Sequence, residues 1–510
     1  MIRKRNIYAA VLSMSVLASC ELDLYPPMGY SEGNVEETVV DEETGAESQY
    51  STRADMLGLR ESIYSSWLKS NVIQEGILLD GMVYAECRAD NAYGGNPGTP
   101  ELMAIEANQQ DSENKNVVRD WDYYQVAVNN ANQIICNIDR IKENDPALTD
   151  REQNQWKAEA ILLKAYALFQ MSQIWGDIPV ENLLPPAITE DNVEEVYPLY
   201  YPERTPIADV YAQLIEDLTF ACQYAPDVDH TNKYLLSKAF AHGLLARVYA
   251  EKTAQDWNKV IEHCEAVEAM GFTLVDDYGQ MWAYDDNDAV RNTSESIFEV
   301  AWLDKAAGHW IWMMYHRNAY NPMDSYSWIK WITPSRDLIA AYEAEGDTER
   351  ANACITYDAA GWSNYYPEDK YAFMHKCPTN VSSIILMRLG EIYLLHAEAL
   401  AMTGDFKKAT EYVNTIRKRA GIAPYKVYFT SQEQAIDKIL HERRLELAFE
   451  GFRFWDLVRH GKAKEVHDRM PLEDSYWQQR RPLTDETILM PIPQSVLDNN
   501  PRLSQNEGYI

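Results

Sequence analysis

The chain has 510 residues, 46% of them hydrophobic, and a formal charge of −33. This length and apolar content suffice for a large core. The negative charge argues against nucleic acid as a partner, because phosphate binding requires clustered Lys and Arg.

The first 19 residues have the form of a signal peptide. A cationic segment, Arg3 to Arg5, precedes the apolar stretch "IYAAVLSMSVLA", which is too short to span a bilayer. The boundary "LASC" resembles a bacterial lipobox, in which the cysteine is acylated and becomes the new N-terminus. We therefore expect Cys20 to carry a lipid anchor. An ordinary signal peptide followed by a chance cysteine is the alternative.

Residues 20–50 form an expected flexible tether, because 21–50 contain nine acidic residues and no Lys or Arg. The other six cysteines lie far apart, without a C-x-x-C pair. Their spacing therefore supports neither a zinc or redox motif nor a disulfide framework. We expect no metal and no cofactor.

Helical periodicity dominates residues 51–510, which we expect to form one domain. Helices are predicted near 120–175, 207–270 and 388–419, where apolar residues recur at three- and four-residue intervals. The stretch "EIYLLHAEALAMTGDFKKATEYVNTIRKRAG" reads as two helices joined at Gly404-Asp405, with Ala397 and Ala409 where the helices approach each other. This pattern is typical of tetratricopeptide helix pairs.

Two long segments, 80–110 and 276–380, lack helical periodicity and are rich in Gly, Pro, Asn, Asp and aromatic residues. We expect loops and short strands there. Irregular segments on a rigid scaffold are also where binding residues concentrate.

The stretch "HERRLELAFEGFRFWDLVRHGK", 441–462, combines charged and aromatic residues at high density. It has two interpretations, a catalytic site with tuned carboxylates or a buried structural network. A cap at Thr430 or Ser431 predicts a helix that Gly451 interrupts. Within the stretch, Arg and Glu could pair at i, i+4 spacing or satisfy buried backbone groups. We favour the structural interpretation.

Four stretches together resemble the SusD/RagB family of Bacteroidota outer-membrane lipoproteins over nearly the whole chain. They are "WDYYQVAVNNANQII" (121–135), "AEAILLKAYALFQMSQIWGDIPV" (158–180), "RLELAFEGFRFWDLVRHGK" (444–462) and "LMPIPQSVLDNNPRLSQNEGY" (489–509). The C-terminal signature spans 441–510.

The resemblance implies a mainly α fold: a tetratricopeptide-type helical superhelix with an irregular, loop-rich ligand-binding face and a few short strands. It also implies a surface-exposed, non-enzymatic lipoprotein of the outer membrane. Such a protein captures oligosaccharides and delivers them to a SusC-like TonB-dependent transporter. Peptide capture, as in RagB-like members, and glycoside hydrolysis are the alternatives.

Sugar binding requires aromatic rings that stack on pyranose C–H faces and polar groups that satisfy the hydroxyls. Eight Trp or Tyr lie between 302 and 331, although the same rings could instead fill a core. A second group lies at 84–99, before the flexible Gly94-Gly95, and Trp362, Tyr365 and Tyr366 form a weaker third group. The glycan-binding candidates are Arg88, Asp90, Tyr93, Trp310, Trp312, Tyr315, Tyr320 and Trp328.

Other chemistries have little support in the sequence. The acidic run "DDYGQMWAYDDND" at 276–288 lacks the order of a calcium loop. No H-E-x-x-H or G-x-S-x-G motif is present. Among 79 acidic residues, paired carboxylates occur by chance and do not establish a hydrolase.

Overall fold

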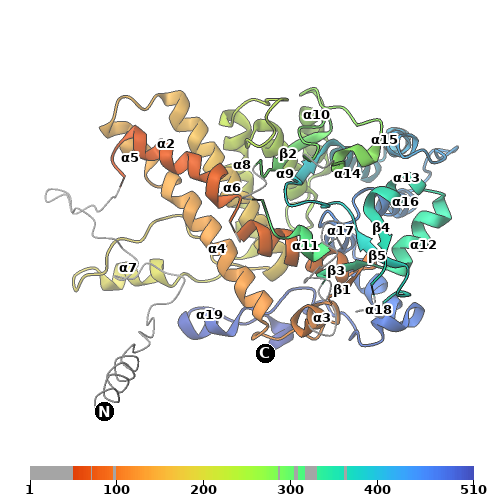
Figure 1. The fold of residues 1–510 in the computed structure, drawn as a ribbon. Helices are drawn as coiled ribbons and strands as arrows, with labels where there is room; N and C mark the ends of the chain where they lie inside the picture. The colour runs from red at the N-terminus through yellow and green to blue at the C-terminus, as the bar shows by residue number, and fades with distance from the viewer. Residues whose placement is uncertain are drawn as a thin grey trace, which may run out of the picture.

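The computed structural model describes residues 50–510, except 71, 96–98, 285–287, 304–307, 316–329 and 361–364 (Figure 1). The predicted signal peptide, Cys20 and nearly all of the tether lie outside the described residues. The described chain is mainly helical with a few short strands, as predicted. None of its helices combines the length and apolar character that a membrane span requires.

Eight helices form the scaffold. Neighbours pack in the order α4, α6, α8, α9, α10 and α14, and α14 then contacts both α15 and α16. In Figure 1 this series runs from the orange α4 to the blue-green helices at the other side of the molecule. The helices are α4 (Lys115–Ile135), α6 (Asp150–Trp175), α8 (Ile207–Tyr224), α9 (Lys238–Ala250), α10 (Trp257–Glu268), α14 (Leu389–Met402), α15 (Phe406–Arg419) and α16 (Gln432–Glu446).

Local sequence signals explain where these helices begin and end. Thr149 caps α6 in a capping box, and Gly176, with φ of 77°, ends it. Gly404, with φ of 92°, and the N-cap Asp405 form the turn between α14 and α15. The fully buried Ala397 and Ala409 allow close packing of this pair. The predicted helix pairs are confirmed.

The remaining elements surround this scaffold. The helices are α2 (Arg53–Ser62), α3 (Pro100–Glu106), α5 (Ile138–Asn144), α7 (Val193–Tyr200), α11 (Trp312–Tyr315), α12 (Arg336–Glu345), α13 (Thr348–Cys354), α17 (Arg453–Arg459), α18 (Ala463–Glu473) and α19 (Gln494–Asn499). The strands are β1 (Ala92–Gly94), β2 (Ser296–Val300), β3 (Ile332–Pro334), β4 (Ile355–Asp358), β5 (Tyr371–Met374) and β6 (Ile384–Arg388). They form three antiparallel pairs, β1–β3, β2–β6 and β4–β5. One hydrophobic cluster includes residues from Met56 to Ile492, so distant parts of the chain share a core.

The prediction that 80–110 and 276–380 contain only loops and short strands is wrong in part. These segments also contain α3, α11, α12, α13 and a π-helical turn at Val83–Cys87. Signals for α12 were present in the sequence: Ser335 caps its first turn, and Gly346 follows its last residue in the left-handed conformation.

The charged stretch 441–462 is a buried network. Glu446 is fully buried and accepts hydrogen bonds from Arg350 at 3.0 Å, Arg388 at 2.6 Å and Arg419. Burial alone would raise the pKa of Glu446, but the three guanidinium groups outweigh it and hold that pKa below its usual range. Glu446 is thus a fixed anion and is poorly suited to proton transfer.

The other charges of the stretch are also paired inside the protein. Glu442 contacts Arg350 at 2.7 Å and Arg417 at 2.8 Å. Asp456 contacts Arg443 and Arg459, each at 2.7 Å. Most partners come from other elements, and the i, i+4 pairs expected within the stretch do not form among these described residues. The structure therefore supports the buried network but corrects its expected pairing.

We expect Arg388→Met to destabilise the protein, because Arg388 contacts Glu295, Glu446 and Glu450 and its side chain is 1% exposed. Removing one partner of a buried ion network typically costs about 3–5 kcal/mol. The measurement is the unfolding free energy in a denaturant titration. The control is Lys259→Met, which removes an exposed pair with Glu262. Equal, small effects of the two substitutions would contradict a structural role for the network.

Candidate functional site

Two segments that the sequence singles out, 84–99 and 302–331, meet at the β1–β3 pair. Tyr93 lies opposite Thr333 in the antiparallel register. Beyond the last pair, the Gly95 N–H donates to the Trp331 carbonyl at 2.8 Å. The pairing fixes these two segments side by side although they are far apart in the chain.

An aromatic cluster covers this junction, and we call it the tyrosine platform. It consists of Tyr93, Tyr365, Tyr366, Tyr476 and Trp477. The Tyr93 ring stacks on Tyr365 with centroids 5.1 Å apart and contacts Trp477 at 4.9 Å and Tyr476 at 5.8 Å. Tyr93 is 1% exposed, whereas Tyr476 is 37% exposed. Tyr93 is therefore the buried base of the platform, and Tyr476 is its accessible ring.

Arg336 places a cation beside the platform. Its guanidinium carbon lies 4.5 Å from the Tyr476 ring centroid and 4.6 Å from that of Tyr366. One nitrogen also donates to the Tyr93 hydroxyl at 2.9 Å. The side chain is 39% exposed and forms an ion pair with Asp474 at 3.7 Å. An accessible ring and an accessible hydrogen-bond donor thus lie next to each other.

A cavity of about 220 Å³ adjoins the platform and is lined in part by Tyr365, Tyr476, Trp477, Glu106 and Arg480. The Trp477 indole N–H donates to Glu106 at 2.5 Å. Burial raises the pKa of Glu106 to about 7, even though Arg480 and the Trp477 hydrogen bond favour its charged form. The cavity thus combines aromatic walls with groups that can donate or accept hydrogen bonds.

Two of the predicted ligand residues lie in the interior instead. Arg88 is fully buried, with its guanidinium carbon 4.1 Å from the Phe454 ring centroid and a hydrogen bond to the Thr487 carbonyl at 2.8 Å. Asp90 is fully buried and pairs with Arg453 at 2.8 Å. Neither side chain reaches a surface in this structure. We therefore leave both residues out of the candidate site.

The predicted aromatic group at 302–331 divides in the structure. Tyr315 is 2% exposed and its hydroxyl donates to the Leu78 carbonyl, so it is an interior residue. Trp310 and Trp312 are half-buried and pack against the main core, which leaves part of each ring accessible. Tyr320 and Trp328 lie outside the described residues.

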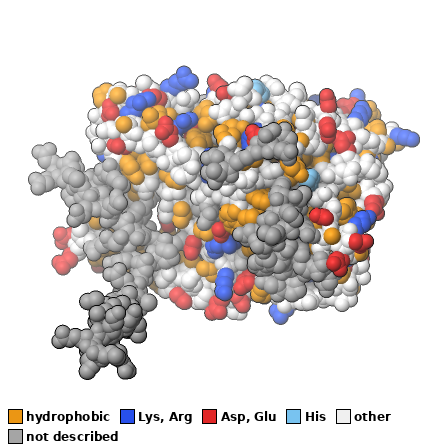
Figure 2. All heavy atoms as spheres, in the orientation of Figure 1, with side chains coloured by type: hydrophobic (Ala, Val, Ile, Leu, Met, Phe, Trp, Pro, Cys, Tyr) orange, Lys and Arg blue, Asp and Glu red, His pale blue; other side chains and the backbone are white. Residues whose placement is uncertain are grey.

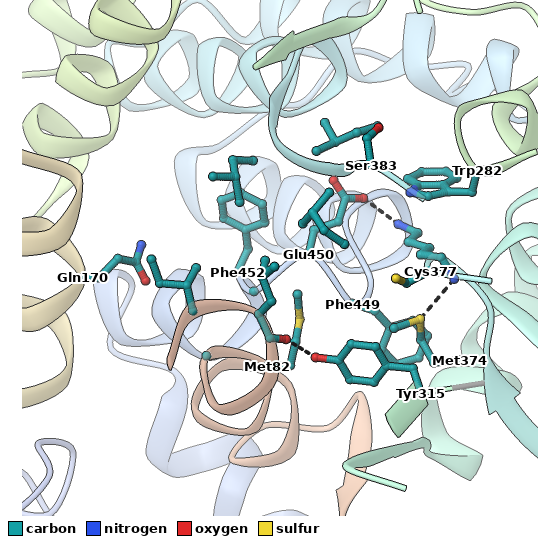
Figure 3. A pocket seen from close by; sticks show the side chains of 18 of the residues that line it. Met82, Gln170, Trp282, Tyr315, Met374, Cys377, Ser383, Phe449, Glu450 and Phe452 are labelled. Carbon is teal, nitrogen blue, oxygen red and sulfur yellow. Dashed lines mark hydrogen bonds and ion pairs between the residues drawn. The ribbon is translucent and has the colours of Figure 1, made fainter. Parts of the chain in front are cut away.

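Tyr315 borders a small interior cavity (Figure 3). Its volume is about 70 Å³, smaller than that of the cavity beside the tyrosine platform. Lys376 and Glu450, which form an ion pair at 2.5 Å, line the same space.

A larger open cavity of about 420 Å³ lies against Trp282, Tyr284, His375 and Asn352. Tyr284 is 39% exposed, and its ring meets His375 edge-on with centroids 6.1 Å apart. The cavity lies within the segment predicted to bind ligand. It is therefore a second location with an exposed aromatic ring.

The sequence interpretation missed Arg336, Tyr476 and Trp477. The available signal was an adjacent Tyr-Trp pair in "EDSYWQQRR", directly after a proline-containing helix and within the C-terminal signature.

Figure 2 shows hydrophobic side chains gathered over the middle of one face, with acidic side chains spread toward its rim.

Comparisons with known proteins agree with this architecture. The model of the SusD family matches residues 378–509, and the model described as "Starch-binding associating with outer membrane" matches residues 61–250. SusD-like protein P38 of Formosa agariphila is 24% identical, and the alignment covers 98% of each chain.

Solved structures show the same fold. A SusD superfamily protein from Bacteroides vulgatus superposes with a TM-score of 0.73 at 19% identity, covering 89% of this chain and 99% of that one. Surface glycan-binding protein A from Bacteroides thetaiotaomicron, in complex with laminarihexaose, gives a TM-score of 0.70 at 17% identity, covering 89% and 99%. With two family models matched in chain order and a relative aligned from end to end, the comparisons support a protein of the SusD/RagB family.

Proposed function

We propose that this protein is a cell-surface glycan-binding lipoprotein. It captures oligosaccharides at the tyrosine platform and delivers them to a SusC-like TonB-dependent transporter. Cys20 holds it on the outer membrane through its lipid. The observation that carries the binding proposal is the exposed Tyr476 ring beside the Arg336 guanidinium, next to the 220 Å³ cavity.

The geometry suits a sugar for a physical reason. A pyranose ring can stack its C–H face on Tyr476, while Arg336 donates hydrogen bonds to the hydroxyls along the edge of the ring. The buried stack of Tyr93 on Tyr365 holds the platform in place, so little ordering remains when a ligand binds.

The charge of the protein narrows the ligand class. With a formal charge of −33, the protein repels anionic polymers at a distance. A neutral glycan is therefore the favoured ligand. Two comparisons support this choice, because one matching family description names starch and one solved structure of the same fold holds laminarihexaose.

Peptide capture is the alternative binding function. A peptide would depend more on backbone-directed polar groups than on stacking, so loss of the Tyr476 ring should affect it less. Titration with both ligand classes separates the two functions.

We expect Tyr476→Ala and Arg336→Ala to weaken glycan binding about fivefold or more each, because a lost stacking or charge-assisted contact is worth about 1 kcal/mol or more. Isothermal titration with laminarihexaose and maltoheptaose measures the affinity. The matched controls remove accessible rings elsewhere. One control is Tyr284→Ala at the 420 Å³ cavity. The other is the double variant Trp310→Ala/Trp312→Ala at the start of α11.

The variants that lose glycan affinity identify the binding site. Reduced affinity in the controls, with unchanged binding by the platform variants, would move the site to α11 or to the Tyr284 cavity. Thermal unfolding of every variant checks that the fold is retained.

The hydrolase alternative rests on Glu106, since a carboxyl group with a pKa of about 7 could act as a general acid. A hydrolase also needs a second carboxylate about 5–10 Å away across the substrate. The nearby Asp474 is already engaged by the Tyr93 hydroxyl and the Arg336 guanidinium. These contacts favour binding without cleavage.

We expect prolonged incubation of the purified protein with laminarihexaose and maltoheptaose to release no shorter sugars, as followed by chromatography. The Glu106→Gln variant, which keeps the size of the side chain, should still bind. Cleavage by the unmodified protein that disappears in Glu106→Gln would establish a hydrolase instead.

A further inference from the structure

Three consecutive scaffold helices bring together a cysteine and two histidines that are far apart in sequence. Cys222 lies in the last turn of α8, His242 in the second turn of α9, and His263 in the middle of α10. One ligand atom from each lies within 4.8 Å of the others. Among the described residues, this is the one group of three such side chains with the geometry of a metal site.

The two imidazole rings face each other through the same kind of nitrogen. Nδ1 of His242 lies 2.9 Å from Nδ1 of His263. One ring therefore donates an N–H to the lone pair of the other. The two rings thus lie in direct contact, and the Cys222 sulfur lies within 4.8 Å of a nitrogen of each ring.

The surroundings hold these side chains in position. His263 is 7% exposed, and the Tyr249 ring stacks on it with centroids 5.8 Å apart and planes 7° apart. Cys222 is a half-buried free thiol. All three residues stand on scaffold helices, of which α9 packs against both α8 and α10 (Figure 1), so their positions are fixed by the scaffold and not by a loop.

The spacing fits a tetrahedral ion closely. Zn–N bonds of about 2.0–2.1 Å and a Zn–S bond of about 2.3 Å place the ligand atoms roughly 3.3–3.6 Å apart. The imidazole nitrogens must separate by a few tenths of an ångström, and the sulfur must move inward by up to about 1.3 Å. Rotation of side chains can provide both changes without moving a helix.

The charged neighbours do not compete for the site. Glu262 forms an ion pair with Lys259 at 2.7 Å on the exposed side of α10. Lys238, the other nearby cation, pairs with Asp227 at 2.6 Å. With three protein ligands, the fourth position remains for water or for an exogenous ligand.

We propose that Cys222, His242 and His263 form a zinc-class metal site that joins α8, α9 and α10. The ligand set of one thiolate and two imidazoles selects a borderline-soft divalent ion such as Zn²⁺ over Ca²⁺ or Mg²⁺. On binding, the thiol releases its proton to solvent. The histidine that donated its Nδ1 proton becomes the Nε2–H tautomer, so both Nδ1 lone pairs face the metal.

The test uses the full-length chain, purified without a polyhistidine tag and stripped with a chelator. We expect isothermal titration with Zn²⁺ to give one ion per chain, and a raised melting temperature because the ion binds only the folded arrangement. Co²⁺ should give the visible bands of a tetrahedral ion together with a thiolate-to-cobalt charge-transfer band.

Matched variants connect the signal to these residues. Cys222→Ser and His242→Gln change half-buried side chains and should remove both the zinc-dependent shift in melting temperature and the cobalt–thiolate band. Cys136→Ser and His230→Gln alter a half-buried thiol and an exposed imidazole elsewhere and should retain both signals. Each variant is compared with its own metal-free melting temperature, so a general loss of stability does not imitate the result. Absence of binding, binding that persists in Cys222→Ser and His242→Gln, or bound Co²⁺ without a thiolate band would overturn the proposal.

Discussion

The buried ion network around Glu446 is the constraint on which the rest of the structure depends. This carboxylate meets Arg350 from α13, Arg388 at the end of β6, and Arg419 at the end of α15. A charge buried without partners is very costly, so these elements can pack only in the arrangement that brings the guanidinium groups together. The network therefore fixes how the C-terminal helices meet the strands.

The same charged region extends beneath the candidate site. The Arg453 pair with Asp90 extends the charged region beneath β1, and Asn91 accepts a hydrogen bond from Arg444 at 2.8 Å. Asp90 and Asn91 directly precede β1. The second residue of β1 is Tyr93, the buried base of the tyrosine platform. A charge-dense signature thus lies beneath the proposed recognition surface, and its own carboxylates are paired inside the protein.

Much of the helical scaffold could be predicted from the sequence, because its signals are local. Apolar periodicity, the Thr149 capping box and the Gly404-Asp405 turn all act within a few residues. The partners of the charged stretch could not be predicted. Glu446 pairs with arginines up to 96 residues away, and no local spacing identifies them.

The candidate site was predictable only in part for the same reason. Aromatic density identified Tyr93 and Tyr365 but could not show that they stack on each other, nor that Tyr476 completes the surface from more than a hundred residues further along. Composition also could not distinguish Tyr315, which is buried in the core, from the half-buried Trp310 and Trp312. Similarly, Cys222, His242 and His263 carry no linear motif, because helix packing alone brings them together.

We propose that glycan contacts concentrate on the tyrosine platform while the charged signature serves the fold. Amide hydrogen exchange, compared with and without a bound oligosaccharide such as laminarihexaose, distinguishes these two roles. We expect added protection at 92–95, 330–336, 365–367 and 474–480, with no change in α16. Added protection confined to 277–284 or to α16, with none at the platform, would contradict it.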